Sequence, residues 1–384
     1  MTEVLQTALT NAVEQTRTNI PAFAQHYPDD CTVRGRYAPR APRGSFPAGA
    51  NQGWTTGFVP GCQWLAYEVT GDDEFRVAAS AHAADFARRV HDGEDLDTHD
   101  LGFLYTLACV APWRLLGAEA DRDAALAAAD ALMLRFLEPA GIIQAWGALT
   151  DPEQRGRTII DSLMNLPLLT WATDVTGEVR YAAAAARHAR RLAAHIVRPD
   201  GTTFHTYTWD AVTGEPVCGT TAQGAADDSC WARGQAWGIY GFSLAFDATG
   251  DPALLAAARS CAEYFLARLP ADGVVFWDLV FSDGDDEPRD ASAASIAACG
   301  LHELSRHETD PARAARYAAA GQRMTQDAVA YSPAAQGVDS DALQLHSVYS
   351  RPAGEGVDEG CLWGDYFYLE ALVRHTRPDW RRYW

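Results

Sequence analysis

The chain has 384 residues, 48% of them hydrophobic and 21% charged, which is long enough for two or three average domains or for one large domain built from repeats. Its formal charge is −20 and all 31 basic residues are arginine, which excludes a Walker P-loop and a Schiff-base lysine and makes nucleic acid a poor partner. No apolar run of about eighteen residues is present that could span a membrane, and the cysteines form no C-x-x-C pair. Residues 1–20 lack the pattern of a secretory signal, so we expect a cytoplasmic protein.

Helical periodicity dominates the sequence, and a short phrase recurs where one helical segment gives way to the next. Glycine in this phrase supplies a left-handed C-cap, and the acidic residue after it favours the positive N-terminus of the following helix. Each phrase is therefore predicted to be the tight turn of an αα-hairpin. The copies are Val69-Thr70-Gly71-Asp72, a weaker Leu116-Gly117-Ala118-Glu119, Val175-Thr176-Gly177-Glu178, Ala248-Thr249-Gly250-Asp251 and Glu308-Thr309-Asp310-Pro311.

The five turns predict five pairs of helices, and two further helices remain near residues 3–26 and 361–376. The paired helices are expected at 56–69 with 73–90, 98–116 with 121–138, 159–176 with 179–197, 231–249 with 251–269, and 290–307 with 310–330. The two remaining helices can pair and close a ring. The predicted fold class is all-α, an (α/α)6 toroid or six-hairpin barrel that forms a single domain over residues 1–384. A closed ring buries its own core, so we expect a monomer or a weak oligomer.

The first helix of each pair begins with aromatic, glycine and polar residues, whereas the second helix is rich in Ala and Arg. In a ring of hairpins the first helices run in the same direction, so these N-terminal clusters are predicted to form one site at one rim. Aromatic rings beside polar side chains suit a sugar, whose C–H faces stack on rings and whose hydroxyls need fixed partners. The alternative is that the tryptophans only fill a large core. The aromatic residues in question are Trp54, Trp146, Trp231, Trp237 and Trp363.

Two carboxylates are candidates for catalysis, Asp100 after His99 and Asp161 within an apolar run. Burial and a nearby like charge raise the pKa of a carboxyl group, which lets it act as an acid near neutral pH. The alternative is that both cap helices, an interpretation that fits Asp227 and Asp228 better. His205 and Arg233 are candidates for holding an anionic group. No cluster has convincing metal-ligand spacing, so we expect no metal and no cofactor.

Six motifs are spread over residues 50 to 375. They are Trp54-Thr55-Thr56-Gly57-Phe58 with Pro60-Gly61, His99-Asp100-Leu101-Gly102-Phe103, Ile160-Asp161-Ser162-Leu163-Met164-Asn165, Asp228-Ser229-Cys230-Trp231-Ala232-Arg233-Gly234-Gln235-Ala236-Trp237-Gly238, Arg289-Asp290-Ala291-Ser292 and Trp363-Gly364-Asp365-Tyr366-Phe367-Tyr368. Through these motifs, which stand in the family's order, the chain resembles the unsaturated glucuronyl hydrolases, glycoside hydrolase family 88. The resemblance implies the same six-hairpin toroid. It also implies removal of a 4,5-unsaturated uronic acid from lyase-generated glycosaminoglycan-type disaccharides and oligosaccharides by hydration of the C4=C5 enol ether.

The resemblance also implies a role for each matching residue. Asp161 is then the general acid and base, and Asp100 is the second essential carboxylate, which orients sugar hydroxyls and keeps Asp161 protonated. The residues implied to contact the uronate and the water are His205, Gln223, Arg233 and Trp237. Those implied to shape the subsites are Trp54, Phe58, His99 and Trp146.

One segment departs from the family pattern. Members that prefer sulfated disaccharides use a Ser and Lys cluster before the last inner helix, where this chain has Ser347, Ser350 and Arg351 and no lysine. Arg351 is a candidate replacement at a sulfate group, although a forked guanidinium differs from a point charge. The alternative is a surface loop that caps the barrel, so preference for sulfated substrates stays open.

Three other functions remain possible from the sequence. An unsaturated rhamnogalacturonyl hydrolase shares the fold and chemistry but takes pectin fragments. A sugar epimerase on the same toroid needs a pair of histidines, and His99 and His205 are not an obvious pair. A non-catalytic carbohydrate-binding protein would keep the aromatic rim alone.

Overall fold

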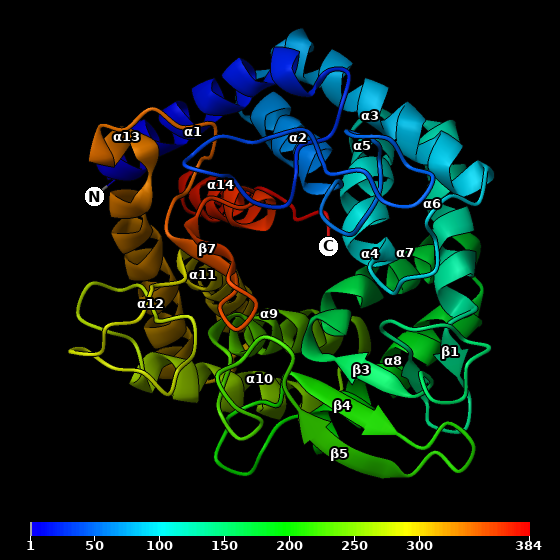
Figure 1. The fold of residues 1–384 in the computed structure, drawn as a ribbon. Coiled ribbons are helices and arrows are strands. Elements are labelled where there is room, and N and C mark those ends of the chain that lie inside the picture. Colours follow the sequence, from blue (N-terminus) through cyan, green and yellow to red (C-terminus); the bar gives the residue numbers. More distant parts are fainter. Residues whose placement is uncertain (1) are drawn as a thin grey trace.

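Six helical hairpins arranged in a ring make up the computed structural model, which describes residues 2–384 (Figure 1). The predicted (α/α)6 toroid is confirmed. The inner layer consists of α2 (Phe58–Thr70), the run from α4 (Leu101–Tyr105) to α5 (Ala111–Leu116), α7 (Leu166–Thr176), α9 (Ala232–Thr249), α11 (Ala291–His307) and α14 (Leu362–Thr376). The outer layer consists of α1 (Thr2–Phe23), α3 (Asp73–His91), α6 (Glu119–Met133), α8 (Val179–His195), α10 (Pro252–Ala267) and α12 (Pro311–Ala328).

The turns between inner and outer helices have the predicted chemistry. Gly71, Gly117, Gly177 and Gly250 end the inner helices in the left-handed conformation, with φ between 67° and 77°. At the fifth turn Glu308 takes this place in an extended conformation, with φ of −77°. The acidic residues cap two of the outer helices, because Asp251 accepts from the Ala253 N–H and Asp310 from the Ala312 N–H.

The inner helices are buried on nearly all sides, and the outer helices bury one face. In α9 every residue from Ala232 to Ala245 is buried, whereas α8 buries its residues at helical spacing, from Tyr181 to Leu192. Helix α1 packs against α14, so the first and last helices close the ring as expected. None of the helices in the described part of the chain combines the length and hydropathy that a bilayer span requires.

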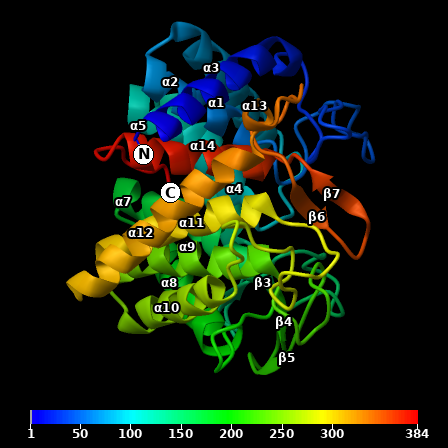
Figure 2. The same ribbon diagram turned by 90° about the vertical axis from the view of Figure 1, so that its left-hand side faces the viewer.

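Within residues 2–384, three small antiparallel sheets lie on the side of the ring where the inner helices begin, and the all-α prediction did not include them (Figure 2). They comprise β1 (Phe136–Leu137) with β2 (Ile142–Ile143), β3 (Arg157–Ile159) with β4 (Thr206–Trp209) and β5 (Pro216–Thr220), and β6 (Ser347–Ser350) with β7 (Glu355–Glu359). Short helical pieces complete the chain: a π-helical segment η1 (Thr106–Val110), 3-10 segments η2 (Ile160–Asn165) and η3 (Val329–Tyr331), and α13 (Pro333–Gln336).

Two expectations about helix starts are wrong. The helix expected over 159–176 begins as strand β3 and the 3-10 segment η2, and becomes α-helical only at Leu166. Asp227 and Asp228 do not cap α9, because the position before this helix is taken by Trp231 and has no side-chain cap. Asp227 instead accepts a hydrogen bond from the Thr221 N–H at 2.8 Å within the preceding loop.

The segment after α14 turns back into the ring on the side opposite the strands (Figure 2). Trp384 stacks on Phe367 with ring centroids 5.8 Å apart, and its indole Nε1–H donates to Glu370 at 2.8 Å. The Arg382 guanidinium lies 3.0 Å from Glu303, which is buried in α11. These contacts fill that end of the ring with the last residues of the chain.

Candidate active site

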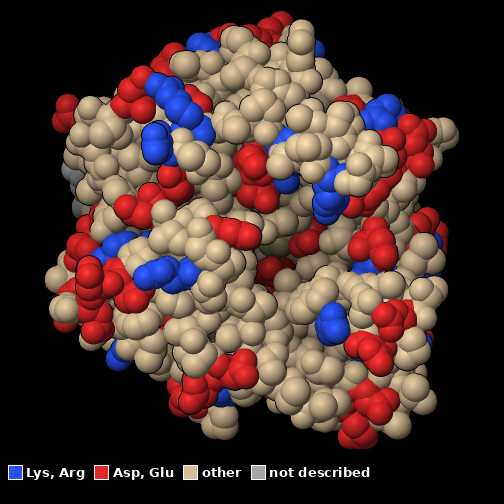
Figure 3. Space-filling model, viewed as in Figure 1, with Lys and Arg blue, Asp and Glu red and all other residues tan. Residues whose placement is uncertain are grey.

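A pocket of about 240 Å³ opens at the rim where the inner helices begin. Figure 3 shows this face of the molecule hollowed near its centre, with acidic side chains inside the hollow. Eight residues to which the sequence analysis assigned a role in the site line the pocket: Trp54, Asp100, Trp146, Asp161, His205, Gln223, Arg233 and Trp237. The prediction that separate clusters meet at one rim therefore holds for these eight.

The backbone around Asp161 brings this carboxyl group to the pocket wall. Strand β3 pairs with β4 so that Ile159 lies opposite Thr206, and the Ile160 N–H donates to the His205 carbonyl at 3.0 Å. The chain then bends from the strand into η2, which carries Asp161 in its first turn. Pairing of β3 with β4 thus places Asp161 and His205 on the same part of the wall.

Asp100 reaches the same wall because α4 lies unusually close to η2. A Cβ atom on Gly102 would lie 2.2 Å from the Asn165 Cα, so only glycine permits this approach. The contact is held by the Phe103 N–H, which donates to the Asn165 side-chain oxygen at 2.8 Å. The two carboxylates, which are 61 positions apart in the sequence, are thereby brought together.

His99 lies between the two carboxylates. Its Nε2 is 3.2 Å from an oxygen of Asp100 and 3.7 Å from an oxygen of Asp161. Burial opposes a charge on His99, yet the two carboxylates outweigh it, chiefly Asp100, and raise the pKa of the imidazole. His99 itself is only 2% exposed and lies behind the carboxylates, outside the pocket lining.

The two carboxyl groups have opposite pKa shifts, although the sequence suggested a raised pKa for both. Burial raises the pKa of Asp161 to about 7, with a further increase from Asp100, while His99 and Arg233 oppose it. Burial acts on Asp100 too, but His99, Thr98 and Asn165 outweigh it and hold the pKa of Asp100 below its usual value. Up to about pH 7 the site thus pairs a carboxyl group that keeps its proton, Asp161, with an ionised one, Asp100.

Neither carboxylate caps a helix, which removes the main structural alternative. Asp100 precedes α4, but its carboxylate accepts from the Thr98 hydroxyl at 2.8 Å and makes no cap hydrogen bond. The Oδ1 atom of Asp161 is buried and has no hydrogen-bond partner among the described residues. A buried carboxyl oxygen without a partner is costly in a structural role and expected of a group that acts on a ligand.

One corner of the pocket can bind a carboxylate. The Nδ1 atom of His205 accepts the backbone N–H groups of Ala222 and Gln223 at 3.0 and 3.1 Å, so the proton of the imidazole is on Nε2. Burial, aided by Arg233, lowers the pKa of His205 to about 3, and the ring is therefore neutral. The Gln223 side-chain oxygen accepts from Arg233 at 3.3 Å, which leaves the amide N–H groups of Gln223 as donors beside a fixed positive charge.

Arg233 is held in place by aromatic rings and backbone oxygens. Its guanidinium lies 4.3 Å from the ring centre of Trp231 and 4.9 Å from that of Trp363, and it donates to the Tyr349 carbonyl at 2.8 Å. Trp54 continues this aromatic wall, since it stacks on Trp363 with centroids 5.2 Å apart and donates from Nε1 to the Tyr349 hydroxyl at 3.1 Å. The wall offers ring faces for a sugar next to a cationic group.

Five predicted site residues do not line the pocket. Phe58 packs beneath Trp54 with centroids 5.8 Å apart, and His99 lies behind the carboxylates. Ser347 is fully buried, Ser350 is nearly so, and Arg351 is exposed with its Nε 3.2 Å from Glu287. Of the segment from Ser347 to Arg351, the pocket lining includes Tyr349 alone.

The sequence analysis did not assign four of the lining residues, Ile159, Ala222, Trp231 and Tyr349, as site residues. Trp231 was noted only as a rim aromatic, although it stands two positions before Arg233. Tyr349 lies between the two serines of the segment that was considered for sulfate binding. Ile159 and Ala222 carry no chemical signal in the sequence, because they form the wall through their place in the fold.

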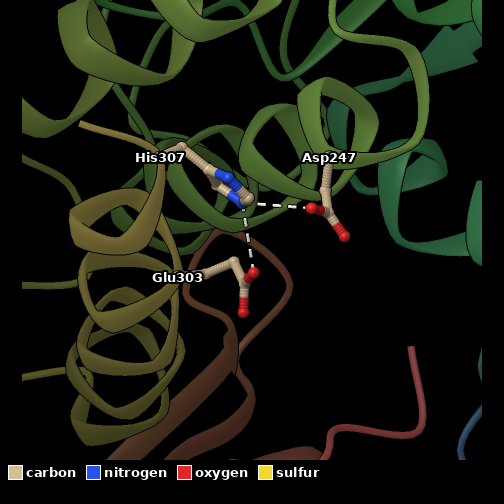
Figure 4. Close-up of side chains that lie close together, drawn as sticks. All are labelled: Asp247, Glu303 and His307. Carbon is tan, nitrogen blue, oxygen red and sulfur yellow. Dashed lines mark hydrogen bonds and ion pairs between the residues drawn. The ribbon is translucent and has the colours of Figure 1, made fainter. Parts of the chain in front are cut away.

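Among residues 2–384, one group of three side chains brings potential metal-ligand atoms within 4.8 Å of one another: Asp247, Glu303 and His307 (Figure 4). This group lies near the inner-helix ends remote from the pocket. Its carboxylates are already paired, since Arg382 contacts both of them and Arg374 lies 3.3 Å from Glu303. The hydrogen bond from His307 and the charges of Arg374 and Arg382 hold the pKa of Glu303 well below its usual value against the effect of burial. We interpret the group as an ion-pair network that anchors the C-terminal segment.

A family model and a relative of known name match this chain and agree with each other. The model of Glycosyl Hydrolase Family 88 matches residues 36–302 of the chain. An unsaturated chondroitin disaccharide hydrolase from Streptococcus pyogenes serotype M1 is 43% identical over 384 residues, covering 100% of this chain and 93% of the streptococcal protein.

Solved structures agree with the sequence match. The crystal structure of unsaturated glucuronyl hydrolase from Streptococcus agalactiae superimposes with a TM-score of 0.94 at 41% identity, covering 100% of this chain and 94% of that one. A mutant of the Streptococcus agalactiae enzyme, complexed with dGlcA-GalNAc6S, superimposes with a TM-score of 0.86 at 38% identity over 100% of this chain and 94% of the other.

Proposed function

The chain belongs to glycosyl hydrolase family 88, and on this basis we propose that it removes a 4,5-unsaturated uronic acid from the non-reducing end of lyase-generated glycosaminoglycan disaccharides and oligosaccharides. The observation that carries the proposal is Asp161, a buried carboxyl group with an unpartnered oxygen and a pKa of about 7 in the wall of the pocket. Such a group keeps its proton up to about pH 7, and its unpartnered oxygen has no structural hydrogen bond to give up during proton transfer.

The proposed reaction adds water across a carbon–carbon double bond. Asp161 donates its proton to C4 of the C4=C5 enol ether, and the positive charge that develops is shared by C5 and the ring oxygen. Water attacks C5 and gives a proton to the Asp161 carboxylate, which restores the acid. The resulting hemiketal opens to a ketone at C5 and a hemiacetal at C1, and the hemiacetal releases the rest of the sugar chain as an alcohol.

The remaining residues are assigned by position. Asp100 is ionised and orients sugar hydroxyls, while its negative charge favours protonation of Asp161. The donors of His205 and Gln223, with the charge of Arg233, are proposed to bind the uronate carboxylate. Trp54, Trp146 and Trp237 are proposed to stack on the sugar rings, with Trp146, which is 40% exposed, nearest to solvent.

Several points rest on the sequence alone. A cytoplasmic location, a monomeric or weakly associating state and a single catalytic domain over residues 1–384 are parts of the proposal. A role for Ser347, Ser350 or Arg351 at a sulfate group stays a prediction, and the ion pair of Arg351 with Glu287 would have to open for it.

The proposal is tested by following the ultraviolet absorbance of unsaturated disaccharides from chondroitin, hyaluronan and heparin, each with and without sulfate. We expect the absorbance to fall with time because the conjugated double bond is consumed. A fall with pectin-derived disaccharides only would indicate a rhamnogalacturonyl hydrolase instead. An unchanged absorbance with every substrate would overturn the proposed reaction.

A further inference from the structure

A buried chain of hydrogen bonds connects the outer helix layer to the segment that carries Asp161. His188 of α8 is fully buried, and its Nδ1 accepts the Ile143 N–H at 2.8 Å. Its Nε2 lies 2.7 Å from the Ser162 hydroxyl, and this hydroxyl donates to the Ile159 carbonyl at 2.6 Å. The hydrogen bonds thus connect β2, α8, η2 and β3 in turn. The last one joins the residues on either side of the turn that contains Asp161.

The contacts determine which group is the donor in each of these hydrogen bonds. Because Nδ1 accepts the Ile143 N–H, the imidazole proton is on Nε2 and is donated to the Ser162 oxygen. The Ser162 hydroxyl can then donate only to its other neighbour, the Ile159 carbonyl. Burial, with a smaller effect from His99, lowers the pKa of His188 to about 3, so the ring stays neutral over the whole physiological range.

The chain of bonds acts at the point where the backbone changes course. Ile159 is the last residue of β3, with an extended conformation at φ −129° and ψ 155°, and η2 begins at the next residue. The bond from Ser162 back to the Ile159 carbonyl closes the first turn of η2 around Asp161. The bond from His188 then fixes Ser162 against a helix that does not itself border the pocket.

We propose that His188 is a positioning residue, which through Ser162 holds the turn that presents the Asp161 carboxyl group to the substrate. This inference rests on the proposed function of Asp161. A direct catalytic role for the Ser162 and His188 pair is excluded by burial, since Ser162 is 1% exposed, His188 is 0% exposed and neither lines the pocket.

Two substitutions of His188 separate its two hydrogen bonds. Asparagine places an acceptor near the Nδ1 position, so it keeps the bond from the Ile143 N–H and loses the bond to Ser162. Glutamine places a donor near the Nε2 position, so it keeps the bond to Ser162 and loses the bond from the Ile143 N–H. Each variant loses one buried hydrogen bond, so we expect similar falls in the thermal midpoint. Only His188→Asn releases the turn at Asp161.

We therefore expect His188→Asn and Ser162→Ala to lower kcat by about 10- to 100-fold with KM changed less than about threefold, because a small misplacement of a catalytic group is enough for such a loss. His188→Gln should keep kcat within about threefold of the unmodified enzyme. The pH above which kcat declines should move to lower values in His188→Asn and Ser162→Ala, because a loosened turn admits water and reduces the burial that raises the Asp161 pKa.

Few charged groups lie near Asp161 and His188, so few of them can account for a change in the pH dependence. Asp161 is faced by His99, Asp100 and Arg233, and His188 is faced by His99 alone among the charged groups that shift it. His82→Asn is the matched control, because His82 is also a buried histidine of an outer helix but packs on Tyr27 at 5.0 Å, away from the carboxylates. This control should lose stability and keep both kcat and its pH dependence.

A measurement without turnover separates this inference from the proposed function. The carboxyl titration of Asp161 is followed by carbon-13 NMR, with the signal assigned by its loss in Asp161→Asn. A lower titration midpoint in His188→Asn and Ser162→Ala, but not in His188→Gln or His82→Asn, supports positioning even if no disaccharide is hydrolysed. Equal midpoints in all four variants, or equal kcat losses in His188→Asn and His188→Gln, would overturn it.

Discussion

At the scale of single residues, the chemistry of the site comes from the difference between two carboxyl groups. Asp100 follows His99 and Asp161 stands within an apolar run, and a raised pKa was expected for both. The structure separates them through hydrogen bonds, since Asp100 lies 3.2 Å from its sequence neighbour His99 and accepts from Thr98, whereas His99 is 3.7 Å from Asp161. Sequence reasoning found both residues but could not find this asymmetry, because the sequence does not show that the side chains of Thr98 and His99 turn toward Asp100 while an oxygen of Asp161 has no hydrogen-bond partner among the described residues.

The first prediction concerns Asp161→Asn. The amide keeps the shape of the side chain but has no acidic proton to deliver, so kcat should fall by about 100-fold or more while the thermal midpoint stays close to that of the unmodified enzyme. The measurement is the rate of absorbance loss on an unsaturated chondroitin disaccharide, with isothermal titration to show that binding persists. A variant that retains more than about a tenth of the activity would contradict the role assigned to Asp161.

The second prediction concerns pH. Asp161 has to be protonated to act, and its pKa is raised to about 7, so kcat should be high below that pH and decline about tenfold per unit above it. Asp100 has to be ionised and its pKa is lowered, so activity should persist well into the acidic range. A profile of kcat between about pH 4 and 9 checks both statements. A kcat that falls as the pH is lowered below about 6 would show that the roles of the protonated acid and the ionised carboxylate have been exchanged between Asp161 and Asp100.

At the scale of elements, the sequence predicted the hairpins well and the strands poorly. Glycine and acidic residues at the turns have a local physical reason to be there, so Gly71 or Asp251 could be recognised without knowledge of the fold. Strands β3 and β4 have three and four residues, too few to show an alternating pattern. Their pairing, which places His205 beside Asp161, follows from packing on the ring and could not be predicted.

The third prediction concerns the contact between α4 and η2. In Gly102→Ala the new Cβ would meet the backbone of Asn165, which cannot move aside, so the two segments must separate. We expect a loss of about 1–3 kcal/mol in the free energy of unfolding and a large fall in kcat, because Asp100 and Asp161 are carried by these segments.

Gly177→Ala is the control for this effect. Gly177 has a φ of 76° but nothing lies within 4 Å of its Cβ position, so the substitution costs about 1 kcal/mol through backbone strain. It should leave kcat unchanged at temperatures where the variant is folded. Urea unfolding and the disaccharide assay measure both quantities. An unchanged kcat in Gly102→Ala would show that the close approach serves packing alone.

At the scale of the whole molecule, the ring is open at the rim for the substrate and filled at the other end by its own C-terminal segment. The fourth prediction is that Trp384→Ala destabilises the protein by about 3–5 kcal/mol, because it removes a buried ring that stacks on Phe367 and takes the indole donor away from one oxygen of the buried Glu370. KM should not change at temperatures well below the unfolding midpoint. Urea unfolding checks the first statement, and a loss below about 1 kcal/mol would show that the segment is not part of the core.

The pairing of α1 with α14 also has a consequence for biosynthesis. Helix α1 leaves the ribosome long before α14, the helix that it packs against, because about 340 residues separate them. The apolar faces of the first hairpins therefore stay uncovered during most of translation, and the non-local contact that closes the ring forms only after α14 emerges. We expect nascent chains that stall before α14 to be targets for chaperones and proteases, whereas the completed ring protects both of its ends at once.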